Sequence, residues 1–103
     1  MTVEAALGIA SLVTVLVIVA AGAAAALTQI RVVDAAREAA RVAAMSGVGQ
    51  GRAAGEAAAP GADVTVASGG AHVTAQVVEP ARGLPGVQLS ARAVARVEPG
   101  AQG

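Results

Sequence analysis

The sequence predicts an α+β fold, in which a long N-terminal transmembrane and amphipathic helix carries a small three-stranded antiparallel sheet packed on its C-terminal half. Three observations predict it: residues 5–30 contain no charged side chain, the charges of residues 31–41 fall on one side of a helix, and residues 63–97 alternate between apolar and polar. Charged residues make up 14% of the 103 residues, against about a quarter in a typical soluble domain. Because the chain has no aromatic residue, Val, Leu, Ile and Ala must fill any core.

The first part of the helix is expected to span a membrane over about residues 5–27. A bilayer core requires about 20 apolar residues in helical form, whereas a signal peptide has an apolar region of only about 7–15 residues. The uncharged stretch is therefore long enough to span and too long for an ordinary cleaved signal. Within it, Leu12–Val19 is bulky and Ala20–Ala26 is nearly all Ala. The Ala-rich part is either a plain lipid anchor or a packing surface, since small residues let helices approach closely in lipid.

An amphipathic extension is expected to continue the same helix over residues 28–46. No Pro or strong breaker occurs before Gly47, so we expect one continuous helix from Thr2 to Ser46, about 65 Å long. On a helical wheel the charges lie within an arc of roughly 120°. They form three i,i+3 pairs of opposite charge, namely Arg31–Asp34, Asp34–Arg37 and Glu38–Arg41. The opposite face is wide and Ala-rich, and its expected packing residues are Val32, Ala36, Ala39 and Ala43.

Residues 47–61 are rich in Gly and Ala, and we expect a linker there with one weak turn of helix at 52–58. A small β unit is expected over residues 62–98, with strands at 63–67, 72–77 and 87–97. The turn Ser68–Ala71 contains two glycines, which tolerate the positive φ angles of a tight hairpin. The Val and Ala residues of one sheet face would then cover the apolar face of the helix. Residues 99–103 are expected to be a disordered tail.

No catalytic, metal-binding or cofactor-binding constellation is expected, and we do not expect an enzyme. The single histidine, His72, is predicted on the polar face of its strand, where a lone His is usually structural or neutral. Only the scattered carboxylates Asp63 and Glu79 could join it, and a metal site needs several ligands together. The chain has no Cys and a formal net charge of +0, with no basic patch for nucleic acid and no motif for a small-molecule substrate.

Glu4 is a carboxylate at the edge of an otherwise unbroken apolar helix. One interpretation is simple, because Glu at a helix N-terminus interacts favourably with the helix dipole and can lie among lipid headgroups. The other interpretation is an assembly contact. A carboxylate inside a membrane costs roughly 2.5–3.5 kcal/mol at the centre and less toward the end. Pairing with a cation of a neighbouring chain would offset that cost.

The segment Met1-Thr2-Val3-Glu4-Ala5-Ala6-Leu7, the long apolar helix after it, and Arg31–Arg41 closely resemble the TadE-like family of minor pilins. These proteins belong to the tight-adherence class of bacterial type IV pili. The resemblance covers about the first 45 residues well, and the later short alternating segments, ending in Ser90–Ala95, also fit it.

The resemblance implies a structural subunit of the pilus that acts in assembly or initiation and in adhesion. Family members are made as prepilins, are cut after a Gly by a prepilin peptidase, and carry a Glu at the fifth mature position. Glu4 looks like that residue, which would place the cut one residue before Met1, behind a basic leader. The implied partners are the membrane, other pilin subunits through the N-terminal helix, the prepilin peptidase and an inner-membrane assembly platform.

Two alternatives to a pilin remain open from the residues. The chain could be a single-pass membrane-anchored binding module, or a small regulatory subunit that packs against a larger membrane complex. The positive-inside rule, applied to Arg31, Arg37 and Arg41, would place the C-terminal part in the cytoplasm. The family places it outside, and a basic leader would reverse the count. We therefore expect a single-pass protein of the cell membrane, with its C-terminal part extracytoplasmic and incorporated in a pilus.

Overall fold

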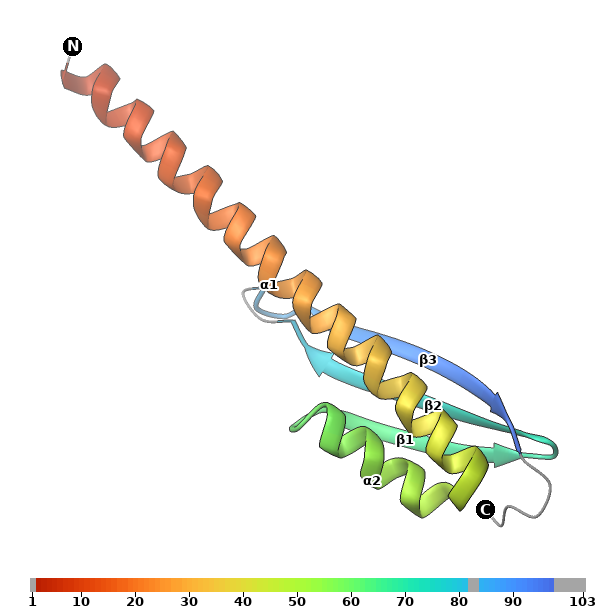
Figure 1. Ribbon diagram of the computed structural model, residues 1–103. Coiled ribbons are helices and arrows are strands. Elements are labelled where there is room, and N and C mark those ends of the chain that lie inside the picture. The colour runs from red at the N-terminus through yellow and green to blue at the C-terminus, as the bar shows by residue number, and fades with distance from the viewer. Residues whose placement is uncertain (1, 82–83, 98–103) are drawn as a thin grey trace.

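A computed structural model describes residues 2–81 and 84–97 of the chain. It contains a 45-residue helix α1 (Thr2–Ser46), a short helix α2 (Val48–Ala58) and three strands, β1 (Asp63–Gly69), β2 (His72–Pro80) and β3 (Gln88–Arg96). Figure 1 shows the sheet packed against the C-terminal half of α1, while the N-terminal half projects alone. The fold class predicted from the sequence is confirmed. The molecule measures 74 × 19 × 17 Å, because α1 is about twice as long as the sheet that it carries.

Helix α1 begins and ends where the sequence predicted, at Thr2 and Ser46. Its end is set by Gly47, whose φ of 104° lies in a region that favours glycine. The amide of Gly47 still donates to the carbonyl of Ala43 at 2.9 Å. At the start of the next helix, the amide of Gly51 donates to the carbonyl of Gly47 at 3.0 Å. A single residue therefore joins two helices, and α2 turns back beside α1 (Figure 1).

The segment expected as a linker is instead largely helical, and this corrects the sequence-based prediction. Glycine disfavours a helix by about 1 kcal/mol relative to alanine, so the composition of residues 47–61 indicated a loop. The structure supplies the compensating contact. The missing side chains of Gly51 and Gly55 let α2 lie directly on α1: a Cβ added at Gly51 would be 2.6 Å from the carbonyl oxygen of Ala39. Both glycines are buried in this contact.

The sheet is antiparallel with the order β1-β2-β3. Gly69 pairs with His72, so the hairpin turn consists of Gly70 and Ala71, and Gly70 has the positive φ of 62° that such a turn requires. Both helices cover the same face of the sheet. Helix α1 lies over β2 and β3, and α2 packs on β1, where a Cβ at Gly55 would be 2.8 Å from Val64. The other face of the sheet is left open.

The core between helices and sheet consists of Val and Ala. The buried helix residues recur every three or four positions and comprise Thr28, Val32, Ala35, Ala36, Ala39, Ala40, Ala43 and Ala44. They meet the inward residues Val64, Val73, Ala75 and Val77 of the sheet. The largest fully buried side chains are only Val and Thr in size, so the helix lies close to the sheet. The alternation predicted for the strands puts these inward residues on the correct face.

Candidate functional site

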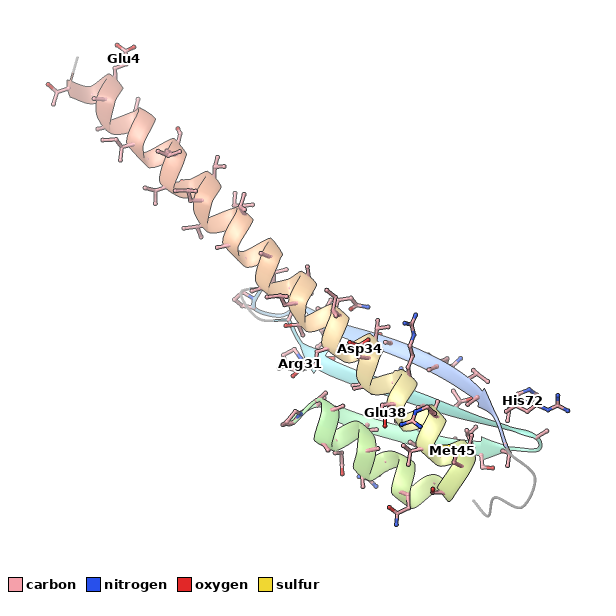
Figure 2. The ribbon with its side chains drawn as sticks, in the orientation of Figure 1. Glu4, Arg31, Asp34, Glu38, Met45 and His72 are labelled. Atoms are coloured by element: carbon pink, nitrogen blue, oxygen red, sulfur yellow. The ribbon has the colours of Figure 1, made fainter. Side chains whose placement is uncertain are left out.

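The exposed N-terminal half of α1 is the most unusual surface of the chain. Large apolar side chains cover it, each between 51% and 73% exposed, and they comprise Val3, Leu7, Ile9, Leu12, Val13, Val15, Leu16, Val17, Ile18, Val19 and Leu27. These residues point to all sides of the helix, and none of the described part of the chain shields them (Figure 2). A helix that is apolar all round is stable only when lipid or other helices surround it.

The length and composition of α1 indicate what surrounds its exposed apolar half. Within residues 2–81 and 84–97, α1 alone is long and apolar enough to cross a membrane, and the most apolar stretch of the helix contains no buried residue. Glu4 and Arg31 bound the uncharged stretch, and 27 helical steps separate them by about 40 Å. A bilayer with its headgroup regions is about 40–45 Å thick. Both charges can therefore reach the headgroup regions of a bilayer, while most of the residues between them fit its hydrocarbon core of about 30 Å.

Glu4 lies in the first turn of α1 and is exposed. Figure 2 shows it at the end of the helix farthest from the sheet. None of the hydrogen bonds or ion pairs of the described residues involves it. Its exposure leaves the carboxylate accessible to lipid headgroups, solvent or another chain.

The four expected packing residues do not lie on the exposed half of α1. Val32, Ala36, Ala39 and Ala43 are each no more than 1% exposed, and they contact the sheet of the same chain. They attach the sheet to the C-terminal half of α1. We call residues 28–97 the head of the molecule. The structure thus separates two surfaces of α1: Glu4 and the bulky apolar residues face outward, and the Ala-rich extension is used within the chain.

An ion pair at the junction of the two halves was missed by the sequence analysis. Arg31 Nη2 donates to both carboxylate oxygens of Glu79, at 3.0 and 3.1 Å, and Glu79 is only 8% exposed. The sequence analysis paired Arg31 with Asp34 along the helix and treated Glu79 as an isolated carboxylate. The alternation of β2 could have indicated a buried carboxylate, because Glu79 follows Val73, Ala75 and Val77 on the inward face. A buried carboxylate needs a cation or several donors.

Two further hydrogen bonds lie at the junction, one within α1 and one between α1 and β3. The hydroxyl of the buried Thr28 donates to the carbonyl of Ala24 at 3.1 Å, and Gln29 Nε2 reaches the carbonyl of Ser90 at 3.5 Å. Together with the Arg31–Glu79 pair, they lie directly after the last uncharged turn of α1. The head is therefore anchored to the helix at the level where the helix would leave a membrane.

Of the predicted pairs along α1, only Glu38–Arg41 forms, with an Arg41 Nη2 to Glu38 Oε1 distance of 2.6 Å. The hydrogen bond and the negative charge of Glu38 raise the pKa of Arg41 above its usual value. Both side chains are exposed. Such pairs contribute little to stability, and this one belongs to the solvated side of α1.

The described residues hold no group of three or more His, Cys, Asp or Glu side chains that could bind a metal ion. His72 is exposed at the start of β2, at the end of the head farthest from the apolar half of α1 (Figure 2). Its cross-strand neighbours are Gly69 and Arg96. Asp63 and Glu79 lie toward the opposite end of the sheet, so the sequence-predicted polar residues are not brought together with it.

The fold and its surfaces define a class of protein: a small α+β head carried by one helix that is long and apolar enough to cross a membrane. The chain belongs to the family of the Mycobacterium tuberculosis protein named "Apoptosis inhibitor Rv3655c". The two are 44% identical over 98 residues, which cover 94% of this chain and 78% of the relative. No protein-family model and no solved structure matches the chain.

Proposed function

We propose that the chain is a minor pilin or pilin-like subunit of a bacterial tight-adherence type IV pilus, acting structurally in assembly or initiation and in adhesion. The division of α1 is the observation that carries the proposal. The apolar stretch of its first half contains no buried residue, and its second half is buried against the sheet. Such a subunit can exchange lipid for the helices of its neighbours while the head stays folded.

Glu4 is the proposed assembly contact. In the membrane its position at the end of the helix allows the carboxylate to reach headgroups, which limits the cost of burying a charge. In a bundle of apolar helices that access is lost, so the carboxylate needs a cation. The terminal amine of a neighbouring subunit, exposed by a prepilin peptidase, would supply it. The proposed partners are thus other pilin subunits, the peptidase and the inner-membrane assembly platform.

The test compares Glu4→Gln, Glu4→Asp and Glu4→Ala in cells that produce the chain together with a tight-adherence apparatus. We expect all variants to reach the membrane fraction in equal amounts, because the uncharged stretch of residues 5–30 is unchanged. The Gln and Ala variants should be depleted at least tenfold from sheared pili, and Asp should retain most incorporation. Equal incorporation of all three variants would refute the role of Glu4.

Mass spectrometry of the N-terminus of the purified protein is a second, independent test. A mature terminus one residue before Met1, after a Gly, would place Glu4 at the fifth position and support the proposal. An unprocessed terminus would favour the membrane-anchored binding module instead.

We further propose that the protein is single-pass in the cell membrane, with the head on the extracytoplasmic side. Because the chain has no Cys, one can be introduced at Ser68, an exposed residue at the end of β1 near the hairpin turn. A membrane-impermeant maleimide added to intact cells should label Ser68→Cys. Labelling only after the cells are opened would place the head in the cytoplasm and contradict a pilin.

A role as an apoptosis inhibitor is a second candidate, favoured by the name of the 44% identical relative. It would fit the membrane-anchored alternative, in which the helix only holds the head at a surface. The Glu4→Gln variant tests whether the two roles depend on the same surface. Loss of pilus incorporation with an unchanged effect on cell death would separate the assembly surface from that activity.

A further inference from the structure

Strand β3 is an edge strand, and the register determines which of its backbone groups are free. The amide of Val97 donates to Ala71, and the carbonyl of Val87 accepts from Ala81. In an antiparallel ladder the residues bonded to one neighbour alternate with residues that face the other way. The odd-numbered residues of β3 therefore bond to β2. The N–H and C=O groups of Arg92, Val94 and Arg96 point away from the sheet.

The outward edge is covered at one end only. At the end near the apolar half of α1, Gln29 contacts the carbonyl of Ser90. No hydrogen bond within residues 2–81 and 84–97 reaches the outward backbone groups from Arg92 to Arg96. Beside them lies a hollow of about 240 Å³ between α1 and β3, lined by Arg37, Ala40, Arg41, Ala44, Met45 and residues 93–96. An unpaired edge beside a hollow has room for another strand.

The surroundings of this edge are basic. Arg37 and Arg41 stand on the α1 side, and Arg92 and Arg96 lie on the open face of the sheet. Only Arg41 is bonded to a carboxylate, that of Glu38, and the ion pairs of the described residues leave the other three without one. Counting Asp34, which is exposed one turn before Arg37, the described residues place four guanidinium groups and two carboxylates around this edge. Among residues 2–81 and 84–97, no acidic side chain lines the hollow.

A second copy of this chain does not fit the edge. Antiparallel pairing of two β3 strands would point their α1 helices in opposite directions, which two chains inserted in the same sense in one membrane cannot do. Pairing in either direction would also bring the arginines of the two copies together, and like charges across a strand pair are destabilising. Basic side chains on an edge strand are a known defence against such self-pairing.

We propose that the β3 edge binds an extended acidic segment of another protein, which adds to the sheet as a fourth strand. Main-chain bonds to Arg92, Val94 and Arg96 would provide affinity, as in other cases of strand addition. Alternate side chains of the added strand point to opposite faces. Carboxylates on the open face would meet Arg92 and Arg96, while small apolar side chains on the other face would lie over Ala40 and Ala44. The recognised pattern is therefore an alternation of Asp or Glu with a small apolar residue.

The probe is a capped seven-residue peptide in which Glu alternates with Val, joined to a fluorophore by a Gly-Ser linker. Binding to the full chain in nonionic detergent micelles is followed by fluorescence anisotropy. We expect saturable binding that weakens as NaCl is added, and at least tenfold weaker binding of the matched peptide in which Lys replaces Glu. No saturable binding of the Glu peptide, or equal binding of the two peptides, would overturn the proposal.

Variants separate strand addition from simple charge attraction. Arg92→Glu and Arg96→Glu should each weaken binding at least tenfold, whereas Arg52→Glu, the same charge change on α2, should have less than a twofold effect. Val94→Pro removes one outward N–H without removing a bond to β2, and prolines are tolerated at such edge positions. It should also weaken binding at least tenfold, and the control Val94→Ala should not.

Backbone hydrogen exchange distinguishes strand addition from attraction between side chains, because side-chain attraction alone would not protect backbone amides. With the peptide bound, the amides of Arg92, Val94 and Arg96 should exchange at least tenfold more slowly. The amides of Ala93 and Ala95 already bond to β2 and should change little. Unchanged exchange at the three outward amides, or binding that survives Val94→Pro in a chain with wild-type circular dichroism, would refute addition of a strand.

Discussion

The contact between α2 and α1 can be tested by adding one methyl group, with Gly51→Ala. The new Cβ would lie 2.6 Å from the Ala39 carbonyl oxygen and 2.8 Å from the Ala43 Cα, against about 3.4 Å for ordinary contact. The obstructing atoms are the backbone of α1 and the Cβ of Ala43, none of which can rotate away, so α2 must move by at least about 0.8 Å. Overpacking of this kind costs typically about 1–3 kcal/mol.

The helix propensity of alanine partly offsets that cost, since replacing Gly in a helix contributes up to about 1 kcal/mol. Because the contacts of the added Cβ all lie below 3.0 Å, we take the upper part of that cost, about 2–3 kcal/mol, and expect a net loss of about 1–2 kcal/mol, which in a head of this size lowers Tm by about 5–15 °C. Gly49→Ala is the matched control. It lies on the same helix with nothing within 4 Å of the added Cβ, so it should raise Tm.

Unfolding can be followed by far-UV circular dichroism and by brief trypsin pulses at increasing temperature, in nonionic micelles. Intrinsic fluorescence is not an option because the chain has no aromatic residue. Trypsin cleaves after Arg, and Arg52, Arg92 and Arg96 lie within the head. A Gly51→Ala variant at least as stable as the wild type would show that α2 does not lie directly on α1.

Three more predictions concern the head. Ala39→Leu should overpack the core, because Ala39 is fully buried under α2. The substitution should lower the free energy of unfolding by about 1–3 kcal/mol, and unchanged resistance to trypsin would contradict that expectation. Arg31→Ala and Glu79→Ala should each cost about 1–3 kcal/mol, and the double variant should cost clearly less than their sum, which a double-mutant cycle in urea measures. Gly70→Val should cost about 1–3 kcal/mol because of its positive φ, whereas Gly69→Val, at an ordinary strand angle, should not; equal Tm values would count against the turn.

Much of the architecture follows from local features of the sequence. The absence of breakers between Thr2 and Ser46, followed by Gly47, determines a continuous helix and its end. The alternation after Asp63 determines which side chains of the strands face inward, because a strand has a period of two. The place of Glu4 at the end of an uncharged stretch is likewise evident from spacing alone. These features depend on neighbours along the chain, so single-sequence reasoning recovers them.

Helix α2 and the Arg31–Glu79 pair were decided by tertiary structure. Gly51 and Gly55 have a low helix propensity. The close packing of α2 on α1, which their missing side chains allow, offsets that local cost. Arg31 and Glu79 are 48 positions apart, and Asp34 offered a nearer partner that the fold does not use. The sequence by itself determined the span of α1 and the faces of the strands. The structure decided which glycines and which charges meet, because those contacts depend on how the helices and sheet pack in three dimensions.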